Sequence, residues 1–260
     1  MDDAEPALDV LLPVGLPPLP PDAAEAGLSA LFAQPRPPWL RANMISALDG
    51  AATGADHRSG SINDPADLRV FQVLRGLADV VLVGAGTVRA EGYRAPRTSE
   101  PLLPGRRERG QPDHPTLAVV TANGDLPVAM LADEPSPWVF ARSDAAHLDR
   151  LRLYLPTNRL HVSDGAVDLA DVVATLAGAG LGQILTEGGP HLLADLIAAD
   201  LVDELCLTWS PQLVGGSAMR VLAGIDWLTP ARPARLAHLL HADSVLLGRW
   251  LLRDEPDTGH

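Results

Sequence analysis

The chain has 260 residues and a formal net charge of −13, and every one of its 20 basic residues is arginine. The acidic balance argues against non-specific nucleic-acid binding, and the absence of lysine excludes Schiff-base lysines and lysine-dependent phosphate loops. An acidic start, no apolar run near the ~18 residues of a membrane span and a single cysteine, Cys206, predict a cytoplasmic protein without disulfides, metal clusters or membrane contact.

The two ends of the chain differ from its middle. Residues 1–38 are rich in proline, and the proline pairs at 17–18 and 20–21 force extended backbone before one short predicted helix at 23–32. We expect residues 1–38 to form an arm lying on a domain of residues 39–253, with residues 254–260 as a C-terminal tail. The alternative for the arm is a ligand of a proline-recognising partner.

Strand and helix patterns alternate from residue 39 onward. Short apolar runs predict strands at 40–48, 79–83, 116–120, 137–141, 159–162, 183–186 and 203–210. Helical spacing predicts helices at 65–77, 87–91, 169–179 and 190–199, the first with Asp64 as N-cap and Pro65 as its first residue. Residues 94–114, with few apolar side chains, are expected to form a long surface loop.

Alternating strands and helices predict an α/β fold with a mainly parallel sheet and helices on both faces. Two C-terminal runs, 234–239 and 244–252, are suited to an antiparallel pair at the edge of that sheet. Ligands of such sheets bind beyond the carboxyl ends of the strands.

One candidate binding turn follows the strand at 79–83. Gly84 and Gly86 allow a sharp turn and a close approach of a ligand, and Thr87 adds a hydroxyl at a helix start. The third glycine of a dinucleotide fingerprint is replaced by Arg89. Taken alone, this motif is as compatible with a structural turn as with a binding loop.

A second glycine-rich turn follows the strand at 183–186. Gly188 and Gly189 lead into a helix that begins at Pro190, and the unpaired N–H groups of that helix start favour an anion such as a pyrophosphate. Glu187 would repel a phosphate, so we expect it to accept hydrogen bonds from a donor-rich group such as an amino-pyrimidine edge. The alternative is a surface carboxylate before a turn.

Four motifs in this order and spacing, at residues 45–50, 82–88, 185–190 and 201–205, resemble the riboflavin biosynthesis reductase family. The resemblance covers about residues 39–253 and is to the reductase half of the bacterial bifunctional deaminase–reductase, in a stand-alone, actinobacterial-type form. It implies a dihydrofolate-reductase-like fold and NADPH-dependent reduction of the ribosyl group of 5-amino-6-(5-phosphoribosylamino)uracil to ribityl, with hydride delivered to C1′ of the ring-opened imine.

The resemblance also implies roles for individual residues. Glu187 and Asn43, which stands where the family usually has lysine, are the expected catalytic positions. The substrate would meet Ser59, Arg75, Arg97 and Glu187. The cofactor would meet Ile45, Ser61, Gly84, Gly86, Thr87, Glu91, Thr121, Gly188, Gly189, Pro190, His191, Leu192 and Leu193. No metal is implied.

Several alternatives stay open at this point. The same fold could reduce dihydrofolate or a 2,5-diamino-pyrimidinone, and a non-catalytic nucleotide-binding regulator could keep the fold without turnover. The sequence 121–123 lacks a basic residue that would favour NADP over NAD. Apolar surface at 201–209, together with the resemblance, predicts a homodimer.

Overall fold

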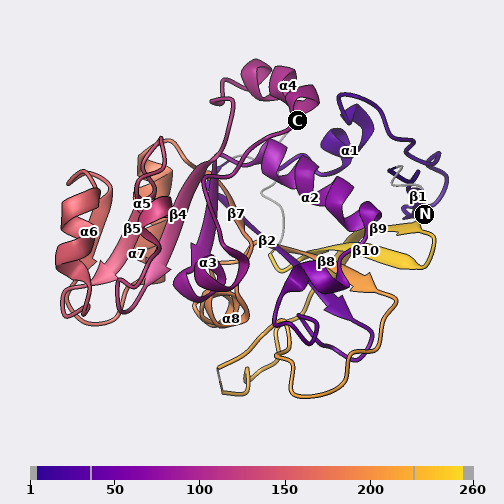
Figure 1. Ribbon diagram of the computed structural model, residues 1–260. Helices are drawn as coiled ribbons and strands as arrows, with labels where there is room; N and C mark the ends of the chain where they lie inside the picture. Colours follow the sequence, from indigo (N-terminus) through magenta and orange to yellow (C-terminus); the bar gives the residue numbers. More distant parts are fainter. Residues whose placement is uncertain (1–4, 36, 225, 254–260) are drawn as a thin grey trace.

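A ten-stranded sheet runs through the computed structural model, which describes residues 5–35, 37–224 and 226–253 (Figure 1). The strand order is β1-β9-β10-β8-β2-β7-β3-β4-β5-β6. The strands are β1 (Asp9–Leu12), β2 (Trp39–Ala47), β3 (Val80–Gly84), β4 (Thr116–Thr121), β5 (Trp138–Arg142), β6 (Leu160–Ser163), β7 (Gln183–Thr186), β8 (Glu204–Ser210), β9 (Arg235–Ala242) and β10 (Val245–Leu251). Strands β8, β2, β7, β3, β4, β5 and β6 are mutually parallel, and β10, β9 and β1 add antiparallel pairs at one edge. The predicted α/β sheet and its C-terminal antiparallel pair are confirmed.

Helices cover both faces of the sheet. They are α1 (Ala26–Leu31), α2 (Pro65–Leu77), α3 (Ala85–Glu91), α4 (Leu103–Glu108), α5 (Val128–Leu131), α6 (Leu148–Tyr154), α7 (Leu169–Gly178) and α8 (Pro190–Ala198), with 3-10 turns η1 (Ser59–Ile62) and η2 (Glu100–Leu102). In the described part of the chain, no helix combines the length and the apolar character that a bilayer crossing requires.

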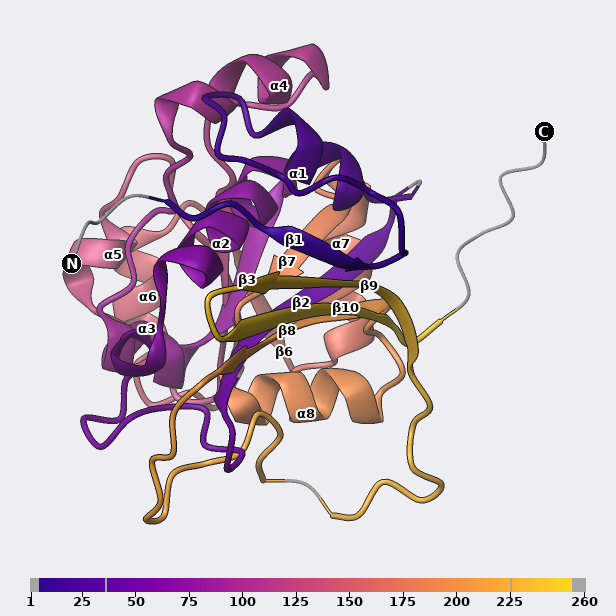
Figure 2. The ribbon, with the colours of Figure 1, turned by 90° about the vertical axis from the view of Figure 1, so that its right-hand side faces the viewer.

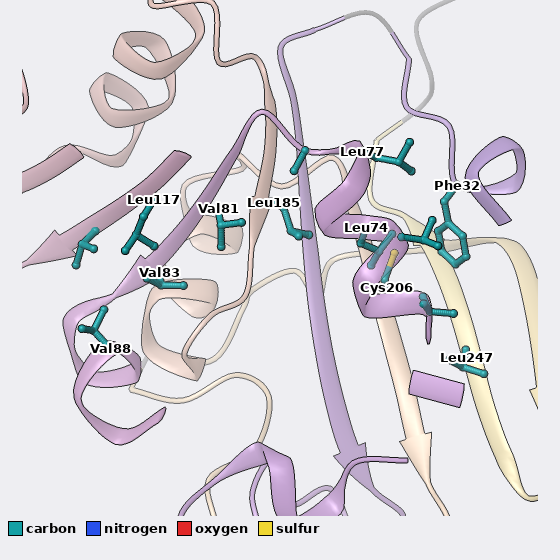
Figure 3. Packing of buried hydrophobic residues seen from close by; sticks show 14 of the residues in the cluster. Phe32, Leu74, Leu77, Val81, Val83, Val88, Leu117, Leu185, Cys206 and Leu247 are labelled. Carbon is teal, nitrogen blue, oxygen red and sulfur yellow. The ribbon is translucent and has the colours of Figure 1, made fainter. Parts of the chain in front are cut away.

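Strand periodicity divides the core into two layers. On β3, Val81 and Val83 pack toward α2 and α3, as Figure 3 shows, whereas Val80 and Leu82 pack toward α7 and α8. Helix α2 begins as predicted, because the Asp64 side chain accepts a hydrogen bond from the Ala66 N–H. Apolar residues on both faces of these strands explain why they read as continuous runs.

The prediction of a surface loop at 94–114 is wrong. This segment contains η2 and α4, and Arg106 of α4 is completely buried. Its guanidinium donates to the carbonyl oxygens of Gly76 and Ala78 at the end of α2, at 3.2 and 2.7 Å, and to that of Pro112 at 2.7 Å. Arg106 caps the C-terminus of α2 by binding its free carbonyl oxygens, and a search for apolar spacing cannot detect such a contact.

The N-terminal segment contributes a strand that the proline-rich sequence did not predict. β1 pairs with β9 of the β9–β10 hairpin, and Figure 2 shows β1 between this hairpin and α1. The guanidinium of Arg69 on α2 pairs with Glu25 at 2.7 Å and donates to the carbonyl oxygens of Pro6, Leu19 and Pro20. Helices α5 and α6 were also not predicted, and the predicted tail at 254–260 lies outside the described residues.

A buried charge cluster joins the strands β2, β8 and β10. Glu204 of β8 is fully buried and accepts hydrogen bonds from Arg41 of β2 and from Arg249 of β10, the latter at 2.7 Å. Arg41 also donates to the carbonyl oxygen of Phe32 at 2.6 Å. Burial alone would raise the pKa of the Glu204 carboxyl, but attraction to Arg41 and Arg249 outweighs burial and lowers that pKa.

Replacing Glu204 with glutamine should destabilise the fold severely. Glu204→Gln keeps the shape but leaves two buried guanidinium groups without a counter-charge, a loss of about 3–5 kcal/mol in the free energy of unfolding. Urea denaturation measures it. Asp113→Asn is the matched control, because the Arg107–Asp113 pair is exposed, and it should move the midpoint little. Equal effects of the two variants would contradict a structural role for the cluster.

Candidate functional site

A cavity of about 530 Å³ opens at the carboxyl ends of the central parallel strands. Strand β7 pairs with β2 only as far as the Ala42–Thr186 pair, whereas β2 continues to Ala47. Among the residues that the structure describes, no strand lies between β2 and β3 beyond Thr186, and the β2 residues Asn43 and Ile45 line the opening. The early end of β7 thus creates the space at the edge of the sheet where ligands of α/β proteins bind.

The two glycine-rich turns meet at the wall of this cavity. The Gly84 N–H donates to the Gly188 carbonyl oxygen at 2.9 Å. Gly188 has a φ of +84°, a conformation that favours glycine, and a Cβ on Gly189 would lie 2.7 Å from the Thr87 hydroxyl oxygen. Backbone rather than side chain therefore forms this part of the wall.

Helix α8 starts at the same wall. Gly189 is its N-cap residue and supplies no side-chain hydrogen bond, while Pro190, His191 and Leu192 of its first turn line the cavity. The N–H groups of this turn and the positive end of the helix dipole together favour an anion.

Arg75 and Glu187 form an ion pair inside the cavity. The Arg75 Nε and Nη2 atoms donate to the two Glu187 carboxylate oxygens, each at 2.7 Å, and the Tyr93 hydroxyl donates to the same carboxylate. The guanidinium carbon lies 4.2 Å from the ring centre of Phe71. Glu187 thus already has donors within its own chain and holds Arg75 in a fixed orientation.

Glu91 of α3 holds the turn that precedes α2. Its Oε1 atom accepts hydrogen bonds from the Ser59 N–H at 2.9 Å and from the Ser59 hydroxyl at 3.0 Å. Ser59 and Glu91 both line the cavity. Two residues expected to meet different ligands are therefore direct partners, and Glu91 fixes the position of the η1 turn.

A third carboxyl group of the cavity, Asp67, is buried without a cation. It lies in the first turn of α2, is 5% exposed and forms a hydrogen bond with Thr208 of β8. Burial, with a smaller contribution from the neighbouring charge of Asp64, raises the pKa of the Asp67 carboxyl to about 6, although the Thr208 bond lowers it. Asp67 therefore differs from Glu187 and Glu91, whose carboxylates have strong donors.

Most of the residues singled out in the sequence come together at the cavity. Its wall includes Asn43, Ile45, Ser59, Arg75, Gly84, Gly86, Thr87, Glu91, Glu187, Gly189, Pro190, His191 and Leu192. Their proximity follows from the parallel strands, because the turns after β2, β3 and β7 meet at one edge of the sheet. Their individual roles stay predictions.

Five other candidates do not line the cavity. Arg97 is exposed, and Leu193 is buried in the core between α8 and the sheet. The Thr121 hydroxyl accepts a hydrogen bond from the Gly124 N–H at 3.0 Å, and the Ser61 hydroxyl donates to Asp56 at 2.8 Å. Gly188 shapes the turn through its backbone. Ser61, Thr121, Gly188 and Leu193 thus support the structure around the site, and none of the five residues forms its wall.

Sequence reasoning missed most of one side of the cavity, where it singled out only Arg75. Residues at intervals of four along and just before α2 line it: Asn63, Asp67, Phe71 and Arg75. This spacing places side chains on one helical face, and the polar residues Asn63, Asp67 and Arg75 at that spacing were the available signal on an otherwise buried helix. Tyr93 and Met219 also line the cavity, but they lie in irregular segments where no periodicity points to them.

Comparison with known families decides the classification. The model of the RibD C-terminal domain matches residues 38–246. The chain belongs to the RibD C-terminal domain family. The resemblance seen in the four motifs is confirmed, and the family model begins just before β2, at the last residue of the proline-rich segment.

Two relatives of the chain are named as reductases. The chain is 30% identical over 203 residues to the 2,5-diamino-6-ribosylamino-4(3H)-pyrimidinone 5′-phosphate reductase of Methanothermobacter thermautotrophicus, covering 75% of this chain and 88% of that protein. The enzyme of the same name from Archaeoglobus fulgidus is 28% identical over 181 residues, covering 69% and 83% of the two chains.

A solved structure shows the same fold. The pyrimidine reductase-like protein of Corynebacterium diphtheriae superimposes with a TM-score of 0.74 at 23% identity, over 87% of this chain and 99% of that one. The expected dihydrofolate-reductase-like fold, with its mostly parallel sheet and antiparallel edge strands, is confirmed.

Proposed function

We propose that this protein is an NADPH-dependent reductase of riboflavin biosynthesis that converts the ribosyl group of 5-amino-6-(5-phosphoribosylamino)uracil to a ribityl chain. The observation that carries the proposal is the pairing of two anion-recognising features in one cavity. One is the uncapped start of α8, and the other is the Arg75 guanidinium held by Glu187. A dinucleotide and a phosphorylated pyrimidine together need two such features.

The wall formed by the two glycine-rich turns fits a dinucleotide. Gly86 has no atom within 4 Å of an added Cβ, and the start of α8 leaves its N–H groups open to a pyrophosphate. In this proposal Gly84, Thr87 and residues 189–192 hold the cofactor, with Ile45 beside the nicotinamide. The dinucleotide supplies a hydride when it is bound, and the protein contributes binding and orientation.

The opposite wall fits the substrate. Arg75 uses Nε and Nη2 to bind Glu187, which directs the rest of its planar guanidinium at the cavity, where a sugar phosphate would be recognised. Ser59, fixed by Glu91, and Asn43 add hydrogen-bonding groups beside it. Glu187 therefore acts first on Arg75, and its contact with the pyrimidine is a further proposal.

A second substrate has specific support. The two named relatives act, by their names, on 2,5-diamino-6-ribosylamino-4(3H)-pyrimidinone 5′-phosphate. This compound carries an amino group at C2 of the pyrimidine ring, where the uracil substrate has a carbonyl oxygen, and has the same ribosyl phosphate. We propose that the reaction takes place in the cytoplasm.

The decisive experiment measures oxidation of NADPH by purified protein with each of the two pyrimidines. Reduction of the uracil compound, with the ribityl product identified by mass spectrometry, is the expected result. Exclusive use of the diamino-pyrimidinone would change the substrate assignment. Tight NADPH binding without turnover of either compound would favour a regulatory nucleotide-binding protein.

Changing Gly189 to aspartate should weaken NADPH binding at least tenfold, or ~1.4 kcal/mol. Aspartate is a favourable N-cap residue, so helix α8 keeps its start, but a carboxylate then occupies the place of the pyrophosphate. Fluorescence titration measures the dissociation constant. Gly189→Ala, which adds the same Cβ near Thr87 without a charge, separates the steric part. Normal binding by a folded Gly189→Asp variant would place the cofactor elsewhere.

Replacing Glu187 with glutamine should lower kcat/KM for the pyrimidine roughly 10- to 1,000-fold, in line with the loss of ~1.4–4 kcal/mol. Glutamine presents an amide N–H₂ to the Arg75 donors, so the guanidinium loses its fixed orientation. Steady-state kinetics at saturating NADPH measure the effect, and NADPH affinity should stay nearly unchanged. Loss of NADPH affinity with intact pyrimidine affinity would assign Glu187 to the cofactor.

We also propose a homodimer. Leu205, Leu207 and Trp209 of β8 are half-buried on one sheet face. The Trp209 ring packs edge-on against Trp250 of β10, with 6.2 Å between the ring centres. A second copy would cover this apolar face. Light scattering should give twice the chain mass at micromolar concentration, and the Leu207→Arg variant should have the mass of a single chain. Trp227→Ser, at a position that is 94% exposed in a separate loop, should leave the mass unchanged.

A further inference from the structure

Reduction of a ribosylamine to a ribitylamine consumes a proton as well as a hydride. The bond between C1′ and the ring oxygen O4′ must break, and the electron pair of that bond stays on O4′, which needs a proton to leave as a hydroxyl. A positioned acid with a pKa near the working pH supplies such protons most efficiently. The proposed function thus requires an acid that none of the residues assigned so far provides.

Asp67 occupies the position where such an acid is needed. It lines the cavity from α2 and forms a hydrogen bond with Thr208, which pairs in register with Ile45 of β2. Ile45 is the residue proposed to lie beside the nicotinamide. Through Thr208, Asp67 therefore lies at the same level of the β2–β8 pair as Ile45. No salt bridge joins Asp67 to another of the described residues, and low exposure disfavours its charged form.

The other ionisable groups of the cavity are less suited to this role. Both Glu187 oxygens accept hydrogen bonds from Arg75 or Tyr93, and the Glu91 Oε1 accepts from Ser59. His57 and His191 line the cavity from its solvent-exposed rim. The charged and titratable groups that line the same cavity as Asp67 are Arg75 of α2, Glu91, Tyr93, Glu187, His57 and His191, and the Asp64 carboxylate lies at the N-cap of α2.

We infer that Asp67 is the acid that protonates O4′ of the ribosylamine, a role that rests on the proposed function. The O–H bond of Asp67 breaks and O4′ takes the proton, while the amine nitrogen lone pair forms a double bond to C1′ as the C1′–O4′ bond breaks. C1′ of the resulting iminium ion then receives a hydride from the reduced nicotinamide, which is oxidised. The product carries a new C–H bond and a free hydroxyl, and Asp67 regains its proton from water.

Kinetics as a function of pH test this role. Wild-type kcat/KM should fall as the pH rises through about 6, because burial raises the pKa of the Asp67 carboxyl to about 6 and the ionised form has no proton to give. Asp67→Asn should lower kcat/KM at least hundredfold, in the range of a lost general acid, and should abolish that decline. NADPH affinity should be unchanged. Asp67→Glu should restore part of the activity.

A matched control comes from Asp64. Asp64→Asn keeps a good N-cap for α2 but removes the neighbouring charge that raises the pKa of Asp67. Its activity at low pH should match that of the wild type, and the decline of kcat/KM should move to lower pH. A purely structural role for Asp67 predicts no such movement.

Thermal unfolding of the ligand-free protein gives a readout independent of turnover. Because the pKa of Asp67 is higher in the folded protein than in the unfolded chain, protonation of Asp67 stabilises the fold. This stabilisation is complete below about pH 4, the ordinary carboxyl range, and is lost as the pH rises through about 6. Asp67→Asn does not ionise. The melting temperature of the variant relative to wild type should therefore rise between pH 4 and pH 7.

Three results would overturn the inference. The first is that Asp67→Asn keeps the wild-type kcat/KM. The second is that Asp67→Asn raises KM but leaves kcat and the pH profile unchanged, which would make Asp67 a hydrogen-bond acceptor only. The third is a melting-temperature difference independent of pH. If wild-type protein reduces neither pyrimidine, the proposed function itself is wrong, and the catalytic role of Asp67 is rejected with it.

Discussion

The sheet of this protein depends on a carboxylate buried between two guanidinium groups. Glu204 lies in β8, next to both β2 and β10, and its two arginine partners come from those two strands. The parallel part of the sheet meets the antiparallel part at this point. Because a buried charge is costly unless it is paired, only one register of the three strands satisfies all three groups. That register also places Thr208 beside Ile45.

The cavity follows from the same arrangement by a difference in strand length. β7 has four residues and β2 has nine, and they start together at the Trp39–Gln183 pair. The longer strand therefore runs past the end of the shorter one, and the backbone of the two glycine turns forms one wall of the space left over. The opposite wall is the α2 stripe from Asn63 to Arg75. A rigid sheet and a well-capped helix thus set the positions of the polar groups before any ligand binds.

The sequence allowed much of this to be predicted where a single local rule operates. Asp64–Pro65 marked the start of α2, and the glycines followed by Pro190 marked the start of α8. Prediction failed where a segment is stabilised by distant partners. β1 pairs with a strand more than two hundred positions away, and α4 depends on the buried Arg106. For the same reason Arg75 was expected to meet a ligand, whereas its pairing with Glu187 and Tyr93 depends on tertiary structure.

The position of β1 has a consequence for how the protein behaves at high concentration. An uncovered edge strand offers a row of unpaired N–H and C=O groups that can template aggregation. Here the eight-residue β9 is covered along part of its length by β1, a strand of four residues that is followed directly by Pro13, which has no N–H to donate. The opposite edge is β6, which also has only four residues. Both borders of the ten-stranded sheet are therefore short, which discourages the addition of strands from other molecules.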